Sequence, residues 1–451
     1  MNKKLSPDDL RVQEQLAGRK ILFANFPADG HFNPLTGLAV YLKELGADVR
    51  WYSSKNYTEK LKKMQIHQYP FKKAIDVEGN DFDKYFPDRA KQKSQIAKLK
   101  FDIIHAFILR GPEYYADLLE IQKEFAFELV ITDCTFTAIP FISELMKIPV
   151  VSIGVLPLTE SSKDLPPAGL GLEPSSGLLG KIKQSVLRWV TKRFIFREPN
   201  KVMHQLFDSY KIPHNNEPIF DMLIRKANLL LQSGTPGFEY KRSDIGDNIR
   251  FIGALLPHKS ATTKEPWFDK RLNTYERVYL VTQGTVEKDI EKLLVPTLEA
   301  FKGTENLVIC TTGGTGTQEL RTRFPQDNLI IEDFIPFGDV MPYTDVYITN
   351  GGYGGVMLGI ENSLPMIVAG IHEGKNEINA RVNYFKLGIN LKTEKPTPDQ
   401  IAKAAKEAST NKIYKQNVEK LSAEFAQYDP NELCTGYIAD LLPAQVKQVS
   451  Y

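Results

Sequence analysis

The sequence is poor in the features that mark secreted, membrane-spanning and metal-binding proteins. Its three cysteines, Cys134, Cys310 and Cys434, are too widely separated for a disulfide framework or a metal-binding motif, and such sparse usage is typical of a reducing compartment. No apolar run approaches the roughly 20 residues that span a bilayer. Residues 1–20 carry charges where a signal peptide has its apolar stretch. We therefore expect a cytoplasmic protein.

The sequence also lacks a strong charge of either sign. It has 57 lysines and arginines against 55 aspartates and glutamates, and this formal net charge of +2 gives no support for nucleic acid as a partner. A D-x-D pattern, Asp81 to Asp83, is a metal and nucleotide signature in another class of transferases, where it ends an apolar strand. Here its neighbours are polar, so we interpret it as a solvated loop that binds no metal.

The chain is long enough for two globular domains, with 451 residues of which 42% are hydrophobic. In both halves short apolar strands alternate with helical patterns, which is the order that gives α/β domains with parallel sheets. A polar segment without periodicity separates the halves at residues 257–275. We predict an N-terminal domain over residues 1–256, a C-terminal domain over 276–428, and a final helix within 429–451 that packs back on the N-terminal domain.

Two polar side chains of the first half follow buried strands. Residues 20–26 form an apolar strand, the turn after it contains His31, and Pro34 opens an amphipathic helix. Residues 127–132 form another buried strand, with Asp133 at its carboxyl end. Because parallel strands of an α/β sheet present their carboxyl ends at one edge, where ligands bind, we expect His31 and Asp133 to lie at the same edge.

The stretch from residue 345 to residue 382 is the most informative part of the second half. Residues 345–349 read as a strand, and residues 350–355, with the sequence NGGYGG, form a glycine-rich turn that opens a helix. Bare N–H groups at the start of a helix point at an anion, and the helix dipole adds a partial positive charge there. This stretch therefore predicts a phosphate site.

Four turns of the second half follow strand ends, so we expect them to converge on one crevice. They contain Gly284 and Thr285, Phe334 and Ile335, Asn350 with Gly352, Tyr353, Gly354 and Gly355, and Glu373 with Lys375. A further glycine-rich turn at residues 313–316 is interpreted as a loop only.

Residues 178–196 form an amphipathic helix whose polar side is entirely basic. Its apolar stripe contains Ile182, Val186, Val190 and Phe194 with Trp189 alongside, and its basic residues are Lys181, Lys183, Arg188, Lys192 and Arg193. Docking on an anionic membrane surface and covering an apolar ligand pocket are two functional interpretations. A surface helix that packs normally on its domain is favoured over membrane docking.

Residues 328–382 resemble the donor-binding signature of the family 1 glycosyltransferases, and GHFNPL at residues 30–35 resembles the acceptor-side motif of that family. The order of elements is similar over nearly the whole chain. The resemblance implies a GT-B fold, in which two Rossmann-like domains face each other across a cleft. It also implies a metal-independent, inverting enzyme without a cofactor, which transfers a sugar from a UDP-sugar to a small lipophilic or phenolic acceptor.

The resemblance assigns roles to individual residues. His31 resembles the general base and Asp133 the carboxylate that orients it. The donor-binding residues are Gly284, Thr285, Phe334, Ile335, Asn350, Gly352, Tyr353, Gly354, Gly355, Glu373 and Lys375. Among them, the hydroxyl of Thr285 and the helix start at residues 352–355 would stabilise the leaving diphosphate.

The sequence departs from the family pattern at three places. Asn350 stands where the family usually has histidine, and Leu358 stands where it usually has a ribose-binding glutamate, with Glu361 one helical turn further on. The pair Gly374-Lys375 replaces the usual Asp-Gln pair that holds the sugar, and we expect Glu373 to accept from the sugar hydroxyls and Lys375 to donate to them.

Three hypotheses follow. The leading one is transfer of a hexose, glucose from UDP-glucose, to a hydroxyl of a small aromatic or lipophilic molecule. The second is a GT-B enzyme that uses another nucleotide sugar or a membrane-lipid acceptor. The third is a non-catalytic protein that binds nucleotide sugars.

Overall fold

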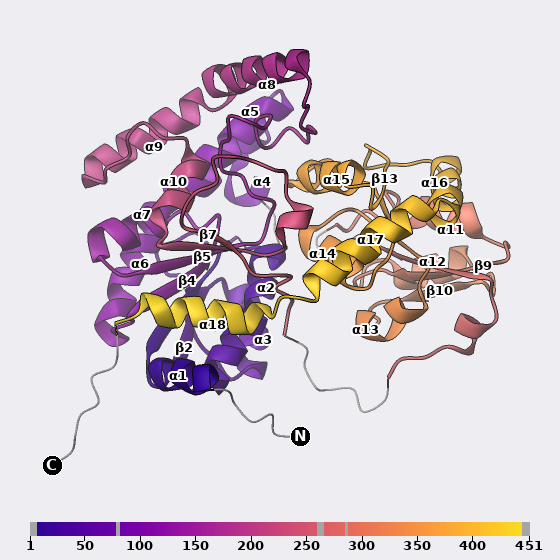
Figure 1. Cartoon of the computed structure of the whole chain (residues 1–451), viewed down its shortest axis with the longest axis horizontal. Coiled ribbons are helices and arrows are strands. Elements are labelled where there is room, and N and C mark those ends of the chain that lie inside the picture. Colours follow the sequence, from indigo (N-terminus) through magenta and orange to yellow (C-terminus); the bar gives the residue numbers. More distant parts are fainter. Residues whose placement is uncertain (1–6, 78–81, 259–265, 285–286, 444–451) are drawn as a thin grey trace.

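The computed structural model describes residues 7–77, 82–258, 266–284 and 287–443, which form two α/β domains side by side (Figure 1). Each domain is built on its own parallel sheet with helices on both faces. The prediction of two Rossmann-like α/β domains is therefore confirmed.

The first domain contains a seven-stranded sheet in the order β3-β2-β1-β4-β5-β6-β7, with all neighbouring strands parallel. Because β4 pairs with β1, the two strands that precede His31 and Asp133 lie next to each other. The strands are β1 (Lys20–Ala24), β2 (Asp48–Ser53), β3 (His67–Pro70), β4 (Leu129–Asp133), β5 (Val150–Gly154), β6 (Leu229–Gln232) and β7 (Ile249–Phe251).

Helices cover both faces of the first sheet, and short 3-10 and π-helical turns interrupt several of them. The helices are α1 (Pro7–Leu16), α2 (Asp29–Glu44), α3 (Thr58–Lys63), α4 (Phe82–Tyr85), α5 (Gln95–Phe101), α6 (Gly111–Glu124), α7 (Ile139–Phe141), α8 (Leu178–Val190), α9 (Arg197–Tyr210) and α10 (Ile219–Lys226). The turns are Lys55–Tyr57, Pro87–Arg89, Asp102–Phe107, Ile108–Arg110, Ile142–Met146, Thr191–Ile195 and Pro236–Phe238.

The second domain contains a six-stranded parallel sheet in the order β10-β9-β8-β11-β12-β13. Its strands are β8 (Arg277–Thr282), β9 (Asn306–Thr311), β10 (Leu329–Glu332), β11 (Val346–Thr349), β12 (Met366–Val368) and β13 (Gly388–Asn390). Its helices and turns are Lys270–Asn273, α11 (Leu294–Phe301), α12 (Thr317–Arg323), α13 (Phe337–Val340), Met341–Tyr343, α14 (Tyr353–Glu361), α15 (Lys375–Tyr384), α16 (Pro398–Thr410) and α17 (Lys412–Phe425).

Each sheet separates two apolar layers because successive side chains of a strand point to opposite faces. In β1, Ile21 and Phe23 join the layer beneath α2, whereas Leu22 and Ala24 join the layer on the other face. The same alternation divides the apolar residues of β8 between the two layers of the second domain. Strands that are buried on both faces form short apolar runs, and for this reason both sheets could be predicted from the sequence.

The last helix, α18 (Pro430–Leu441), leaves the second domain and packs on α1 and α2 of the first (Figure 1). Cys434 and Ile438 are buried in the apolar layer beneath α2. The side-chain amide of Gln15 donates to the carbonyl oxygens of Ala439 and Leu442, at 2.6 and 3.0 Å. The chain therefore crosses between the domains twice.

Two predicted helix boundaries were wrong. The helix after β1 begins at Asp29, so Pro34 lies inside it and His31 lies in its first turn. The sequence pattern also predicts a helix from about residue 287 to residue 301. This helix begins only at Leu294, because the amide of Gln283 donates to backbone carbonyls at residues 287 and 289 and holds that segment as a loop.

Some elements of the first half were not expected from the sequence. Helix α1 forms within the charged N-terminal segment. The edge strand β3 forms within residues 54–126, a lysine-rich segment whose pattern predicts helices and loops. The D-x-D pattern is described only in part, since Asp81 lies outside the described residues. Asp83 forms an ion pair with Arg89 at 2.9 Å.

Candidate active site

Three side chains, His31, Asp133 and Thr135, form a hydrogen-bonded cluster where β1 and β4 end. Nδ1 of His31 lies 2.8 Å from Oδ1 of Asp133, and the hydroxyl of Thr135 lies 2.5 Å from the same oxygen and 3.2 Å from Nδ1. The His31 side chain is 15% exposed, whereas that of Asp133 is fully buried. The imidazole therefore reaches the surface with a carboxylate behind it.

The surroundings of Asp133 keep it ionised. The carboxylate accepts the backbone N–H groups of Phe26 and Thr135, at 2.7 and 2.9 Å. Burial by itself would raise the pKa of Asp133. The attraction of His31 and the hydrogen bonds from His31, from the Thr135 hydroxyl and from the Phe26 N–H outweigh burial and hold the pKa below its ordinary value. An ionised Asp133 accepts the Nδ1 proton of His31, and this fixes the tautomer whose Nε2 is free to act as a base.

Strand pairing places these groups together. Thr132 lies opposite Ala24 in the parallel β1–β4 pair, so the segments that follow both strands leave the sheet at the same edge. One segment carries the Phe26 amide and α2 with His31, and the other carries Asp133 and Thr135. The proximity of His31 and Asp133 that we expected from the sequence is present.

The glycine-rich turn after β11 lies on the second domain, and α14, which it opens, lies against α2 of the first (Figure 1). Gly351 has φ +84°, and a Cβ there would lie 1.8 Å from Oδ1 of the buried Asn379, so only glycine fits. Gly352 is the N-cap of α14, and a Cβ at Gly354 would meet no atom within 4 Å. The first turn of α14 therefore has open space in front of its backbone.

Asn350 joins the ends of two neighbouring strands. Its side-chain amide donates to the carbonyl oxygen of Gln283, which follows β8. The side-chain amide has a second N–H, so the expected donation from Asn350 to the donor substrate stays a prediction. Gly284, the next residue of that turn, has φ +74° and lies beside Asn350, whereas Thr285 lies outside the described residues.

Phe334 presents an open aromatic ring beside a second glycine turn. The residue is 69% exposed, whereas Ile335 is buried. A Cβ at Gly314, which has φ +86°, would lie only 3.5 Å from the Phe334 ring. The turn at residues 313–316, interpreted from the sequence as a loop only, therefore belongs to the candidate site. Its position directly after β9, at the same sheet edge as the other turns, was the signal that could have found it.

Two side chains of α14, those of Tyr353 and Leu358, have their contacts within the protein. The Tyr353 hydroxyl donates to the carbonyl oxygen of Ser233 and accepts from the amide of Gln232 at 3.2 Å, both in the first domain. The side chain of Tyr353 therefore joins the domains, and its backbone N–H is what remains for a ligand. Leu358 packs against the apolar core of the second domain, so it offers nothing to a ribose hydroxyl.

Glu373 and Lys375 form an ion pair at the start of α15. The Glu373 side chain is 60% exposed, and that of Lys375 only 13%. The pair presents an acceptor and a donor side by side, which are the two functions needed to bind sugar hydroxyls. Among the described residues, no three His, Cys, Asp or Glu side chains gather in a way that could hold a metal ion.

Comparisons with known proteins identify the family. Residues 302–439 match the model of the erythromycin biosynthesis protein CIII-like C-terminal domain. The chain is 32% identical over 413 residues to 4'-demethylrebeccamycin synthase of Lentzea aerocolonigenes, covering 91% of this chain and 97% of that protein. The chain is a family 1 glycosyltransferase.

Two further similarities agree with this assignment. UDP-glucosyltransferase 1 of Beauveria bassiana (strain ARSEF 2860) is 28% identical over 424 residues, covering 90% of this glycosyltransferase and 91% of that protein. The crystal structure of the glycotransferase of kitacinnamycin superposes with a TM-score of 0.73 at 16% identity, covering 95% of this chain and all of the other. The two Rossmann-like domains are thus those of a GT-B fold.

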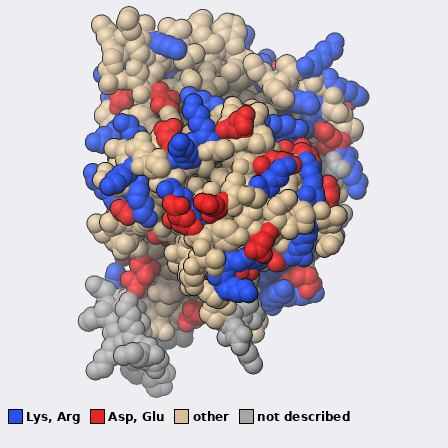
Figure 2. Space-filling model, turned by 90° about the vertical axis from the view of Figure 1, so that its right-hand side faces the viewer, with Lys and Arg blue, Asp and Glu red and all other residues tan. Residues whose placement is uncertain are grey.

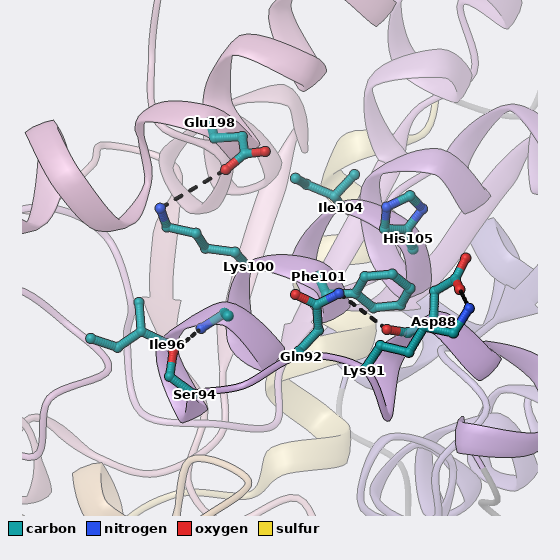
Figure 3. Close-up of a pocket in the computed structure, with 11 residues that line it drawn as sticks. Asp88, Lys91, Gln92, Ser94, Ile96, Lys100, Phe101, Ile104, His105 and Glu198 are labelled. Atoms are coloured by element: carbon teal, nitrogen blue, oxygen red, sulfur yellow. Dashed lines mark hydrogen bonds and ion pairs between the residues drawn. The ribbon is translucent and has the colours of Figure 1, made fainter.

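The first domain of the glycosyltransferase contains a cavity of about 670 Å³ (Figure 3). It is lined by α5, the turn that precedes it, the π-helical turn after it, and Glu198 of α9. Phe101, Ile104 and Ala97 give it an apolar part, and its rim carries charged residues such as Asp88. Cavities of this size commonly bind drug-sized ligands.

Replacing Gly354 with alanine is expected to weaken UDP binding without loss of stability. The added Cβ meets no protein atom, and alanine favours a helix over glycine by about 1 kcal/mol. A diphosphate that approaches the backbone here would meet the methyl group, so we expect affinity to fall about tenfold, or about 1.4 kcal/mol. Titration calorimetry with UDP measures the first effect and thermal unfolding the second.

Gly436→Ala in α18 is the matched control, because a Cβ there also meets no atom within 4 Å. It is expected to leave UDP affinity unchanged. Equal UDP affinity for Gly354→Ala and the wild type would show that the diphosphate does not approach this turn.

Proposed function

We propose that this glycosyltransferase transfers glucose from UDP-glucose, with inversion and without a metal ion, to a hydroxyl of a small aromatic or lipophilic natural product. The observation that carries the proposal is the pairing of His31 with the buried, ionised Asp133. That pairing leaves Nε2 as a base on a partly exposed ring, opposite a domain whose glycine turn suits a diphosphate.

The reaction is a single displacement. Nε2 of His31 takes the proton of the acceptor hydroxyl as its oxygen attacks the anomeric carbon, and a new C–O bond forms. The bond between the anomeric carbon and the β-phosphate oxygen breaks, and UDP leaves with that electron pair. Attack from the face opposite the leaving group inverts the anomeric configuration. Asp133 stabilises the imidazolium that forms.

The second domain would hold the donor. The uracil ring would stack on the exposed ring of Phe334 beside Gly314, with the backbone of Ile335 next to it. The backbone N–H groups at residues 352–355 would bind the diphosphate, and the α14 dipole would stabilise the charge that develops as UDP leaves. This charge compensation is the basis for a reaction without a metal ion. Glu373 and Lys375 would bind the sugar hydroxyls.

The acceptor would bind in the 670 Å³ cavity of the first domain. Its apolar part, which includes Phe101 and Ile104, suits a lipophilic ring system. The similarity to 4'-demethylrebeccamycin synthase and to UDP-glucosyltransferase 1 supports a natural-product acceptor and glucose as the sugar.

A nucleotide-sugar screen followed by a transfer assay tests this function. UDP-glucose is expected to raise the melting temperature, because a ligand that binds only the folded state stabilises it in proportion to its affinity. With a panel of phenols, UDP release and a β-glucoside product are then expected without added metal. An α-glucoside would refute inversion, and a requirement for a divalent ion would refute the metal-free mechanism.

The Ala97→Trp variant checks the acceptor side in the same assay. Filling the cavity is expected to raise KM for the phenol and to leave KM for UDP-glucose unchanged. A change in the donor KM alone would place the acceptor elsewhere.

A second candidate is transfer from another nucleotide sugar. It is favoured by Leu358, which packs in the core where the family usually has a carboxylate for the ribose hydroxyls. The sugar of thymidine diphosphate lacks the 2'-hydroxyl, so a donor of this kind needs no carboxylate to bind that hydroxyl. A larger thermal shift with thymidine-diphosphate glucose than with UDP-glucose would decide for this candidate.

A further inference from the structure

Helix α8 is turned with its apolar side toward solvent. Ile182, Val186 and Trp189 are 53%, 54% and 61% exposed, and the leucines of its first turn are more exposed still. The side that faces the domain instead carries the polar residue Gln184, which is buried, and the buried Thr191 lies on that side about two turns further on, where the π-helical turn Thr191–Ile195 begins. An ordinary surface helix has the opposite orientation. The prediction that this helix packs normally on its domain is therefore wrong.

Hydrogen bonds fix this orientation. The Gln184 side chain accepts from the backbone N–H of Ser175 at 2.8 Å, and Arg188 donates to the carbonyl oxygen of Leu165 at 2.6 Å. Both partners belong to the loop that precedes α8. Rotating the helix to bury Trp189 would break both bonds, so exposure of the apolar side is a property of the fold.

The exposed side is surrounded by positive charge. No acidic residue occurs between Glu173 and Glu198. The exposed basic residues of that interval are Lys181, Lys183, Lys192, Arg193 and Arg197, whereas Arg188 faces the domain. In Figure 2 the uppermost part of the molecule, at the height of α8 in Figure 1, is tan and blue without red at its edge. An apolar face with lysines and arginines at its borders is typical of helices that lie in the interface of an anionic bilayer.

We propose that the α8 face, defined as Leu178, Leu179, Ile182, Val186, Trp189 and Phe194 with the basic residues beside them, docks on an anionic lipid bilayer. The apolar side chains enter the acyl boundary, and the lysines and arginines bind lipid phosphates. None of the helices in the described part of the chain is long and apolar enough to cross a bilayer, so the contact is peripheral.

The inner side of α8 connects this face to the domain interface. Arg188, Thr191 and Lys192 line a cavity of about 290 Å³ that also reaches Glu377 and Arg381 of the second domain. A docked α8 therefore places a cavity between the two domains close to the bilayer. Delivery of a lipophilic acceptor from the bilayer is a consequence that rests on the proposed function, whereas docking itself does not.

Co-sedimentation with vesicles tests the docking. The full chain is expected to bind vesicles of phosphatidylcholine mixed with phosphatidylglycerol at low salt and to be released at high salt, which screens the attraction. Vesicles of pure phosphatidylcholine are expected to bind it far more weakly. Of the three tryptophans, Trp51 is buried and Trp267 partly buried, so a blue shift of tryptophan fluorescence on binding reports Trp189.

Two variants locate the contact. Ile182→Ser/Val186→Ser/Trp189→Ser is expected to lose vesicle binding. Lys181→Glu/Lys183→Glu is expected to lower the partition coefficient at least about 25-fold, since each lysine near an anionic surface contributes about fivefold.

Matched controls carry the same changes elsewhere on the surface. Leu119→Ser/Ile245→Ser removes exposed apolar residues, and Lys62→Glu/Lys63→Glu reverses two lysines of α3. Both are expected to bind vesicles as the wild type does.

Three results would overturn the proposal. The first is that the chain does not bind anionic vesicles at low salt, and the second is that the control variants lose vesicle binding as much as the α8 variants do. The third is a dimer in solution that the triple serine variant dissociates, which would assign the α8 face to a second copy of this chain. Transfer to a water-soluble phenol without vesicles is expected to be unchanged in both α8 variants. Failure of the docking and failure of the proposed function are therefore distinguishable.

Discussion

His31→Ala is expected to lower kcat by about 10²–10⁴-fold, the usual contribution of a positioned general base. The acceptor hydroxyl then has no group to take its proton as it attacks. UDP binding is expected to persist, because the groups that would bind the diphosphate belong to α14 of the other domain. Steady-state kinetics measure the first effect, and titration calorimetry with UDP the second.

His67→Ala is the matched control, because His67 lies on the exposed edge strand β3 and makes no contact with the candidate site. Its kcat is expected to equal that of the wild type. Full activity of His31→Ala would refute the assignment of the base. Loss of UDP binding together with activity would indicate that the substitution disturbs the domain arrangement.

The second large effect concerns a buried ion pair between the domains. Arg381 of α15 donates to Oε1 of Glu239 in the first domain at 2.5 Å, and it also contacts Glu377 at 3.1 Å. Its guanidinium carbon lies 4.2 Å from the centre of the Tyr240 ring. The side chains of Arg381 and Glu239 are only 3% and 7% exposed. Burial opposes the charge of Arg381, but the carboxylate of Glu239 outweighs it and raises the pKa of the guanidinium.

Arg381→Ala is expected to reduce the free energy of unfolding by about 3 kcal/mol, the lower end for breaking a buried pair, because the buried Glu239 carboxylate then keeps only the more distant Arg242, at 3.6 Å. Activity is expected to fall as well, since Lys375 and Glu377 belong to the same first turn of α15, and Glu377 accepts the backbone N–H groups of Gly169 and Gly171 at 2.8 Å. Urea unfolding measures the stability change.

Arg323→Ala provides the comparison. Arg323 also forms an ion pair, with Glu291, but the two side chains are 40% and 50% exposed. Exposed pairs contribute at most about 1 kcal/mol. The double variant Glu239→Gln/Arg381→Met removes both charges and is expected to recover part of the lost stability. A loss no larger for Arg381→Ala than for Arg323→Ala would show that the buried pair does not hold the domains together.

Local patterns were sufficient for the strands. The patterns at residues 48–53, 277–282 and 306–311 predict strands, and the strands have these same bounds in the structure. Their apolar residues are buried on both faces of a parallel sheet, so they form short apolar runs, and the shortness of these runs favours a strand over a helix. Helix starts were harder to predict. The position of Pro34 suggested that a helix begins there, whereas α2 begins five residues earlier, at Asp29.

Contacts between distant residues were beyond the sequence patterns. Nothing around Tyr353 indicates that its hydroxyl reaches Ser233, and nothing around Gly314 indicates that a phenyl ring lies beside it. The orientation of α8 could not be predicted from the sequence either. Its period of 3.6 residues was evident, but which side faces the domain depends on hydrogen bonds to Leu165 and Ser175.

The sequence by itself determined the two parallel sheets, the order of their strands along the chain, and the residues at the strand ends, including His31, Asp133 and the glycine turn. Burial and backbone conformation act locally, so these features leave a periodic or glycine-rich pattern. The tertiary structure alone decided which strands are neighbours in each sheet, that the Asn350 amide donates to the turn after β8, and that α8 turns its apolar side to solvent. These outcomes depend on which partners satisfy buried polar groups, and those partners are distant in the sequence.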